Sequence, residues 1–388
     1  MSATELSSNY WADLSDALID TTVGDYQFIE DLGHGSYGGL FLGQHLGSKD
    51  YVAIKVLGKG GLTPEQAQLQ QLEIELQSEL KHPSLLALHC VIEDASYIYM
   101  VMDLCDHGDL FDYVLRDQDD NGRRPESIVI DLFTQILQGI EYMHAQGIYH
   151  RDIKLENVLL KSGFDCKVAD FGLATRDKLS MEFGCGSAMY LAPEHFADED
   201  DDEDDTLLSP YDAAASDVWS LGILLLALLF GRNPWQEANV VDPVFAEYKR
   251  HPAMLKHHLF PDLSPALVGL LNQAVLNPDP SQRVSVAEFL KLFQTLPGLY
   301  SDLTPMDIPT QQQQQQQPQD AKPRYDSAFF SMETTQGAAA LSWSDMVEED
   351  YEAACYNNND DDDLAAVPHD DDDTDMFVHS DEKESWWL

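Results

Sequence analysis

The segment of this chain that is most informative about its fold is His150-Arg151-Asp152-Ile153-Lys154-Leu155-Glu156-Asn157. Asp170-Phe171-Gly172 begins thirteen residues after Asn157, and Ala192-Pro193-Glu194 follows further along. Each motif is short, but their combined order and spacing would hardly arise by chance. These motifs therefore provide the context in which the glycine-rich segment upstream is interpreted.

That glycine-rich segment is Gly33-His34-Gly35-Ser36-Tyr37-Gly38. Its GxGxxG spacing alone is a weak signal, because dinucleotide-binding folds share it. In those folds the glycines open a helix, whereas residues 39–46 here have the pattern of a strand. The arrangement therefore indicates a hairpin that covers nucleotide phosphates with its backbone N–H groups.

A lysine follows on an apolar strand, in Val52-Ala53-Ile54-Lys55. An unpaired ammonium group would be costly in such a place. Nucleotide phosphates and a helix carboxylate would stabilise it, and Glu73 is the best-placed candidate. The alternative, an edge-strand lysine that reaches solvent, is disfavoured by the glycine-rich hairpin upstream.

The hydrophobic periodicity changes along the chain. Apolar positions alternate in residues 26–57 and 90–102, which predicts antiparallel strands, and a helical pattern separates them at 64–81. After Gly108 the pattern is helical, with predicted helices at 127–146, 217–230, 265–276 and 284–296. The sequence thus predicts a small β-rich lobe with one long helix and a larger helical lobe.

The motifs together resemble those of the eukaryotic protein kinases over most of the chain. The resemblance implies an α+β, bilobal protein-kinase fold followed by a disordered acidic tail. The expected parts are an N-terminal extension at 1–24, a kinase domain at 25–296 (small lobe 25–102, hinge 103–105, large lobe 106–296, acidic insert 198–205) and a Gln/Asp-rich tail at 297–388.

The same resemblance implies an ATP site. Lys55 would hold the α- and β-phosphates, Ala53 and Leu159 would lie on either side of the adenine, the hinge would offer backbone hydrogen bonds, and Met102 would be the gatekeeper. The residues expected around ATP are Leu32, Gly33, His34, Gly35, Ser36, Tyr37, Gly38, Gly39, Leu40, Ala53, Lys55, Glu73, Met102, Asp103, Cys105 and Leu159.

Four residues are expected to carry the phosphoryl transfer. By resemblance, Asp152 would orient the substrate hydroxyl and accept its proton, while Lys154 would offset the charge of the γ-phosphate. Asp170 and Asn157 offer the hard oxygen ligands that suit Mg²⁺. The expected cofactors are therefore ATP and Mg²⁺.

The class of substrate can also be inferred. Lys154, two residues after Asp152, resembles the serine/threonine kinases rather than the Ala-Ala-Arg pattern of tyrosine kinases. Ser187 stands where that class usually has threonine, which keeps a hydroxyl group near Asp152, and it is expected to contribute to substrate binding. The motifs Gly108-Asp109-Leu110-Phe111, Ile148 to Asp152 and Phe183 to Ser187 look like those of the fungal nutrient-response kinases related to the fission-yeast repressor of meiosis.

Several residues match structural supports of the family, and one departs from it. Glu194 and Arg283 match the pair that joins the activation segment to the large lobe. Asp217 matches the buried helix residue that fixes the catalytic loop. Gln77, one turn after Glu73, occupies a position that is commonly aliphatic, so the alignment of that helix is expected to be less self-sufficient.

The activation segment has a second departure. Phe183 falls where many kinases carry a phosphorylatable threonine, so Arg151 lacks an obvious phosphate partner. We expect activity without phosphorylation at that position, with Glu182 as a fixed anion for Arg151. Phosphorylation of Thr175 or Ser180 is the alternative.

The charge of the chain, −47 at neutral pH, argues against general nucleic-acid binding. It favours basic protein substrates, and by resemblance Asp109 and Glu156 would face an arginine three residues before the target hydroxyl. Ala227 stands where some such kinases have a further glutamate. The insert at 198–205 is either a solvated loop or a surface that attracts basic substrates or partners.

The compartment is inferred from what the sequence lacks. The five cysteines form no CxxC pair, the N-terminus has no apolar signal segment, and the apolar run 221–230 is too short to span a bilayer. We therefore expect an intracellular protein, cytoplasmic or nuclear, that does not bind membranes. The oligomeric state is left open.

A second class of function is a pseudokinase or scaffold that binds partners through the kinase fold and the acidic tail. Pseudokinases commonly lose the equivalent of Lys55, Asp152 or Asp170, and this chain keeps all three. A small-molecule kinase of similar fold is disfavoured by Ala192-Pro193-Glu194. The sequence therefore favours an active protein serine/threonine kinase.

Overall fold

The computed structural model describes residues 14–34, 38–116, 123–196 and 209–301. The predicted extension up to residue 13, the insert at 198–205 and the tail beyond residue 301 lie outside these ranges, as do Gly35, Ser36 and Tyr37.

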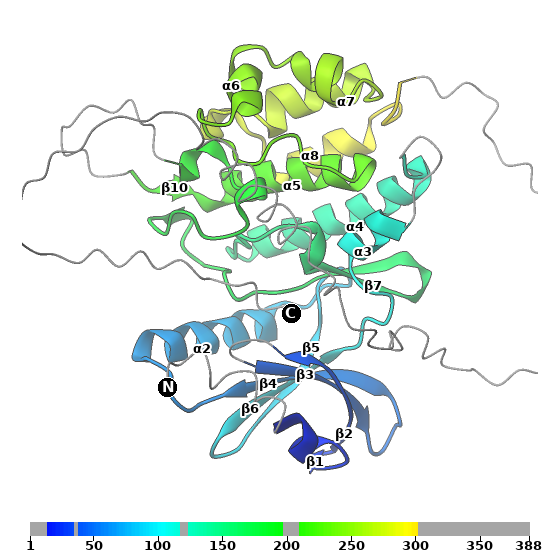
Figure 1. Cartoon of the computed structure of the whole chain (residues 1–388), viewed down its shortest axis with the longest axis vertical. Helices are drawn as coiled ribbons and strands as arrows, with labels where there is room; N and C mark the ends of the chain where they lie inside the picture. The colour runs from blue at the N-terminus through cyan, green and yellow to red at the C-terminus, as the bar shows by residue number, and fades with distance from the viewer. Residues whose placement is uncertain (1–13, 35–37, 117–122, 197–208, 302–388) are drawn as a thin grey trace, which may run out of the picture. The chain divides into compact units, whose positions relative to one another are not determined.

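The small lobe is built on a six-stranded antiparallel sheet of order β1-β2-β3-β4-β6-β5 (Figure 1). Apolar side chains on one face, among them Phe28, Phe41 and Ile54, pack into a buried cluster. The strands predicted in residues 26–57 and 90–102 are confirmed. Their bounds are β1 Thr22–Val23, β2 Tyr26–His34, β3 Gly38–His45, β4 Tyr51–Gly58, β5 Leu88–Glu93 and β6 Tyr97–Asp103.

The segment before the sheet also belongs to this packing. Residues 14–18 are helical, and Leu14, Leu18 and Ile19 pack against the same apolar cluster of the sheet. This described part of the predicted extension is therefore joined to the small lobe by burial of apolar surface.

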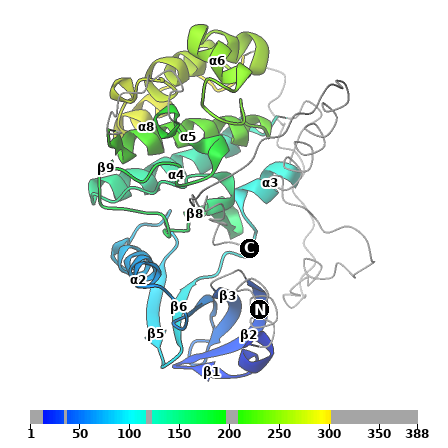
Figure 2. The same ribbon diagram turned by 60° about the vertical axis from the view of Figure 1, so that its left-hand side comes forward.

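One helix, α2 (Pro64–Glu79), lies beside the sheet next to β5 (Figure 2). It begins at a reciprocal cap, in which Thr63 Oγ1 accepts the Gln66 N–H and Gln66 Oε1 accepts the Thr63 N–H. Such a capping box satisfies two backbone donors that would otherwise be unpaired. The helix ends two residues before the predicted boundary at Lys81.

The large lobe is mainly helical. Its helices are α3 Leu110–Arg116, α4 Glu126–Ala145, α5 Ala213–Phe230, α6 Pro243–Arg250, α7 Pro265–Leu270 and α8 Val286–Gln294. The hairpin β7 Val158–Lys161 and β8 Asp165–Val168 is antiparallel, as is the short pair β9 Leu179–Ser180 and β10 Tyr211–Asp212. The predicted helix at 265–276 is real but changes after Leu270 to π-helical turns at 271–275.

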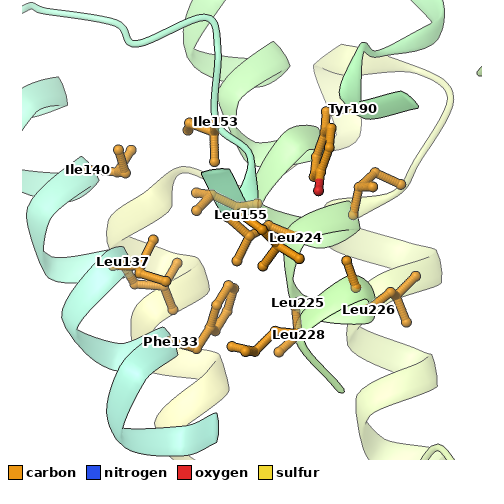
Figure 3. Close-up of a cluster of buried hydrophobic side chains, with 14 of the residues drawn as sticks. Phe133, Leu137, Ile140, Ile153, Leu155, Tyr190, Leu224, Leu225, Leu226 and Leu228 are labelled. Atoms are coloured by element: carbon orange, nitrogen blue, oxygen red, sulfur yellow. The ribbon is translucent and has the colours of Figure 1, made fainter. Parts of the chain in front are cut away.

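The core of this lobe forms where α4 meets α5. Figure 3 shows Phe133, Leu137 and Ile140 of α4 facing leucines of α5, with Ile153 and Leu155 of the catalytic stretch in the same cluster. Packing of these two side chains ties the loop at 150–157 to the core. Burial on this scale limits how far the loop can move.

Helix α5 is apolar and long enough to cross a membrane, yet 83% of it is buried inside the protein. Asp212 caps its start by accepting the N–H groups of Ala214 and Ala215. Gly231 ends it in the left-handed conformation (φ 68°), which glycine adopts without strain. The helix is thus the central core element of the large lobe.

Candidate active site

The catalytic stretch, residues 150–157, lies in a loop between α4 and β7, and a side chain of α5 holds this loop in place. Asp217 of α5 accepts the backbone N–H groups of His150 at 2.9 Å and Arg151 at 2.8 Å. His144 Nε2 lies 2.8 Å from the same carboxylate. Burial alone would raise the pKa of Asp217, but the bond from His144, the nearby imidazoles of His144 and His150 and the backbone bond from Arg151 together lower that pKa. The predicted support of the loop by Asp217 is confirmed.

Asp152, Lys154 and Asn157 form a buried network in this loop. Asn157 Nδ2 donates to the backbone oxygen of Asp152 at 2.8 Å and to its Oδ2 at 2.9 Å. Lys154 Nζ lies 3.2 Å from Asp152 Oδ2. The Asp152 carboxylate is therefore held in one orientation. A group that aligns a substrate needs such a fixed orientation.

The activation segment completes this network through Ser187. The Ser187 hydroxyl donates to Asp152 Oδ1 at 3.2 Å and accepts from Lys154 Nζ at 3.0 Å. Gly186 beside it has φ 108°, and a Cβ there would meet the Arg151 carbonyl oxygen at 2.6 Å. Only glycine permits this close approach, which brings Ser187 to Asp152.

Asp170 lies next to the same loop because the hairpin β7–β8 returns the chain to it. The Ala169 N–H donates to the Asn157 carbonyl oxygen at 2.8 Å. Asp170 has φ 62°, a conformation that is rare and costly outside glycine and typical of functional sites. Burial raises the pKa of Asp170, although Lys55 acts in the opposite direction.

Lys55 of β4 and Glu73 of α2 form the buried ion pair that the sequence predicts, with Nζ and Oε1 2.7 Å apart. Burial opposes the charge of Lys55, but the Glu73 and Asp170 carboxylates outweigh it and raise the pKa of the ammonium group. The lysine thus joins α2 to the site of Asp170.

Gln77 holds the same helix in place by hydrogen bonds. Its side chain is buried, and Nε2 donates to the Leu86 carbonyl oxygen at 3.2 Å and to Met102 Sδ at 3.5 Å. The expected loss of an aliphatic contact at this position is therefore offset by polar contacts to the gatekeeper and to the segment before β5.

The residues expected around the adenine gather on one apolar cluster. Leu40, Met102, Cys105 and Leu159 all pack within it, and Ala53 lies opposite Met102 in the β4–β6 register. The Asp103 N–H donates to the Ala87 carbonyl oxygen, so that group is already engaged at the hinge. The residues expected to cover the phosphates lie on two neighbouring strands. Strand β2 carries Leu32, Gly33 and the backbone of His34, and β3 carries Gly38, Gly39 and Leu40. The three residues between these strands, Gly35, Ser36 and Tyr37, fall outside the described residues.

Asn157 and Asp170 fit a divalent cation. Asn157 Oδ1 is buried and has no hydrogen-bond partner among the described residues. Within the same ranges no group of three or more His, Cys, Asp and Glu side chains could hold an ion. An amide oxygen and one carboxylate would therefore share the ion with phosphate oxygens and water, the usual situation for Mg²⁺.

Glu156 lies close enough to Asp109 to affect its protonation. Burial raises the pKa of Asp109 to about 6, and Asp112 and Glu156 add to that rise. Asp109 Oδ1 also accepts the Asp112 N–H at 2.8 Å, so it caps α3. Glu156 Oε2 is buried without a hydrogen-bond partner in the described parts of the chain, and burial raises the pKa of this carboxyl group as well.

The supports of the activation segment are also in place. Arg283 forms two bonds to Glu194, at 2.6 and 2.7 Å, which confirms the predicted pair. His144 is a residue that the sequence did not single out. His144 is one of several polar residues of the amphipathic helix α4, and its sequence position does not reveal a partner 73 residues away.

A strand lysine paired with a helix glutamate, beside a loop that carries Asp152 and Asn157, defines a nucleotide-dependent phosphotransferase site. The protein kinase domain model matches residues 26–292. The chain therefore belongs to the protein kinase family.

Two similar curated proteins come from Schizosaccharomyces pombe. The negative regulator of sexual conjugation and meiosis is 32% identical over 307 residues, which are 75% of this chain and 64% of that protein. The serine/threonine-protein kinase ksp1 is 37% identical over 269 residues, 66% of this chain and 54% of the relative. The chain thus spans less than two thirds of either length, and the similarity confirms the resemblance to the meiosis repressor.

Proposed function

We propose that the chain is a serine/threonine protein kinase that uses ATP and Mg²⁺. The observation that carries the proposal is the buried network in which Asn157 and Lys154 fix the Asp152 carboxylate and Ser187 contacts it. The names of similar proteins support the substrate class, because ksp1 and a budding-yeast relative both carry the words serine/threonine-protein kinase in their names.

In this proposal the side chains of the protein position the reactants. Lys55 holds the phosphates of ATP, and Asp152 accepts the proton as the substrate oxygen attacks the γ-phosphorus and the bond to the β-phosphate oxygen breaks. Lys154 offsets charge on the transferred group. A bound Mg²⁺, held by Asp170 and Asn157, would neutralise phosphate charge. Positioning and charge neutralisation account for most of the rate enhancement in such reactions.

We further propose a preference for basic residues upstream of the target hydroxyl. The buried, unpartnered Oε2 of Glu156 would gain a charge-assisted bond from a substrate guanidinium group. Asp109 keeps one oxygen for its helix cap and can offer the other. The net charge of −28 over residues 1–300 would also attract basic peptides, and this attraction should weaken with added salt.

A peptide array with radiolabelled ATP tests both proposals. Serine and threonine peptides should be phosphorylated, and arginine three residues before the hydroxyl should increase the rate. Glu156→Gln should reduce this increase and leave the rate on a peptide without arginine largely unchanged. Transfer with no effect of upstream arginine would refute the basic preference alone.

An intracellular site of action remains a proposal. It is supported by Cys90, Cys105, Cys166 and Cys185, which are free thiols in the structure. Fractionation of cells followed by detection of the full chain would test it.

A further inference from the structure

The activation segment turns one large apolar side chain toward the large lobe just before Ser187. Phe183 is half-buried, whereas Glu182 before it and Gly184 after it are exposed. The ring of Phe183 carries no charge, so it can hold the segment only by packing against apolar partners. The surface on which this ring lies therefore decides what the residue does.

The ring of Phe183 packs against a small buried cluster that contains Tyr149, Tyr211 and Ala213. The centroids of the Phe183 and Tyr211 rings are 5.4 Å apart, and the ring planes are inclined at 54°. Aromatic pairs at this separation attract one another beyond the gain from burial alone. Tyr211 is held in turn by His195, because the centroids of these two rings are 4.2 Å apart.

The cluster beneath the ring joins three parts of the large lobe. Tyr149 directly precedes the catalytic stretch at 150–157, and its backbone exchanges two hydrogen bonds of 2.9 Å with that of Thr175. Tyr211 belongs to β10, which leads into α5 (Figure 1). Ala213 is the first residue of α5, the helix that holds the catalytic loop. A ring that packs here is therefore fixed relative to that loop.

The connection from Phe183 to Ser187 is short but costly to order. It contains Gly184 and Gly186, whose φ angles are 68° and 108°. Glycine loses more backbone freedom than any other residue when its conformation is fixed. At the far end the Ser187 hydroxyl donates to Asp152 Oδ1 at 3.2 Å. The ring contact of Phe183 supplies the anchor at the near end.

We propose that Phe183 is a positioning residue that fixes the activation segment by packing on Tyr149 and Tyr211. This contact keeps Ser187 at Asp152 without any covalent modification of the segment. The inference rests on the proposed kinase function and concerns its regulation. A segment held by an aromatic ring needs no activating phosphorylation at this position, and a phosphatase cannot release it.

Peptide kinetics of full-length variants at position 183 test this. Phe183→Leu keeps an apolar contact and should retain most of the kcat/KM for the peptide, whereas Phe183→Ala should lower it about tenfold, because the ring contact and its buried area are lost. Phe183→Asp should be at least as slow as the alanine variant, since a carboxylate is not stabilised on an apolar surface. The KM for ATP should stay close to that of wild type in all three. An aspartate variant faster than the alanine variant would show that the position responds to negative charge, and would overturn the proposal.

Deuterium exchange of residues 181–189 is a second measurement, and it does not depend on activity. Exchange there should be faster in Phe183→Ala than in wild type, while α4 and α5 keep their protection. The control Met181→Ala removes an apolar side chain of the same segment that is 56% exposed, and it should change neither the exchange nor the rate. Unchanged exchange in Phe183→Ala, or equal loosening of α4 and α5, would overturn the proposal. If the wild-type chain transfers no phosphate, the proposed function fails, and the exchange measurement still decides whether Phe183 orders the segment.

Discussion

Arg151 Nη1 donates to Glu182 Oε2 at 2.5 Å, and Arg151 Nη1 also reaches Ser180 Oγ at 3.3 Å. Burial opposes the charge of Arg151, yet the interactions with Glu182 and Tyr211 together outweigh it and raise the pKa of the guanidinium group. The Glu182 carboxylate thus supplies this arginine with a fixed anion. Thr175 and Ser180, the alternative acceptors of phosphate, are both buried.

We therefore predict that Glu182→Gln lowers kcat/KM about fivefold. The variant loses one charge-assisted hydrogen bond, and the effect of this loss is moderate because solvent around the exposed glutamate already weakens the ion pair. Phosphatase treatment of the purified active protein should leave its rate unchanged, and mass spectrometry should find Thr175 and Ser180 unmodified. A large loss of activity after phosphatase treatment would instead favour phosphorylation of Thr175 or Ser180.

A charged side chain at position 77 should reduce stability and activity more than an aliphatic one. Gln77→Glu places a carboxylate against the Leu86 carbonyl oxygen in a buried site, so we expect a loss of about 1–3 kcal/mol in the free energy of unfolding and a lower kcat. Gln77→Leu should retain most activity, because an aliphatic residue can fill the same space. Denaturant unfolding and initial rates of both variants measure this. Equal stability and rates of wild type and Gln77→Glu would show that the hydrogen bonds do not position α2.

The preference for basic peptides should depend on pH. Because the pKa of Asp109 is raised to about 6, its carboxyl group is largely neutral below that pH and charged above it. The arginine of a substrate stays charged throughout. The ratio of kcat/KM for a peptide with upstream arginine to that for its alanine counterpart should therefore rise as pH increases through 6.

Asp109→Asn is the control for this pH dependence. Asparagine can still cap α3, so the fold should be kept, while the ratio should lose most of its rise near pH 6. An unchanged pH profile in this variant would assign the effect to another group.

The sequence predicted the parts of the site that depend on fixed motifs. Lys55, Asp152, Asn157 and Asp170 sit in patterns whose residue types and spacing leave few alternatives, and Glu73 follows from the need of a buried lysine for a partner. The two-lobed fold could be predicted because the spacing of apolar residues changes near Gly108 from a strand pattern to a helical pattern.

Other features depend on tertiary contacts that no local pattern encodes. The distance between Arg151 and Glu182 is set by the path of the activation segment, so the sequence suggested the pair without fixing its geometry. The bonds of Gln77 to Leu86 and Met102 required knowledge of what lies opposite one buried position. The double role of Asp109 as helix cap and partly buried acid could likewise be seen only in the fold.

The most direct test of the central claim is transfer of the γ-phosphate of ATP, in the presence of Mg²⁺, to serine or threonine peptides by the purified full chain. We predict phosphoserine or phosphothreonine in the product, and a loss of roughly a hundredfold or more in rate for Asp152→Asn and Lys55→Met, because each removes a positioned charge from the reacting groups. A wild-type protein that folds and binds ATP but transfers phosphate to no peptide, or variants as fast as wild type, would contradict this account.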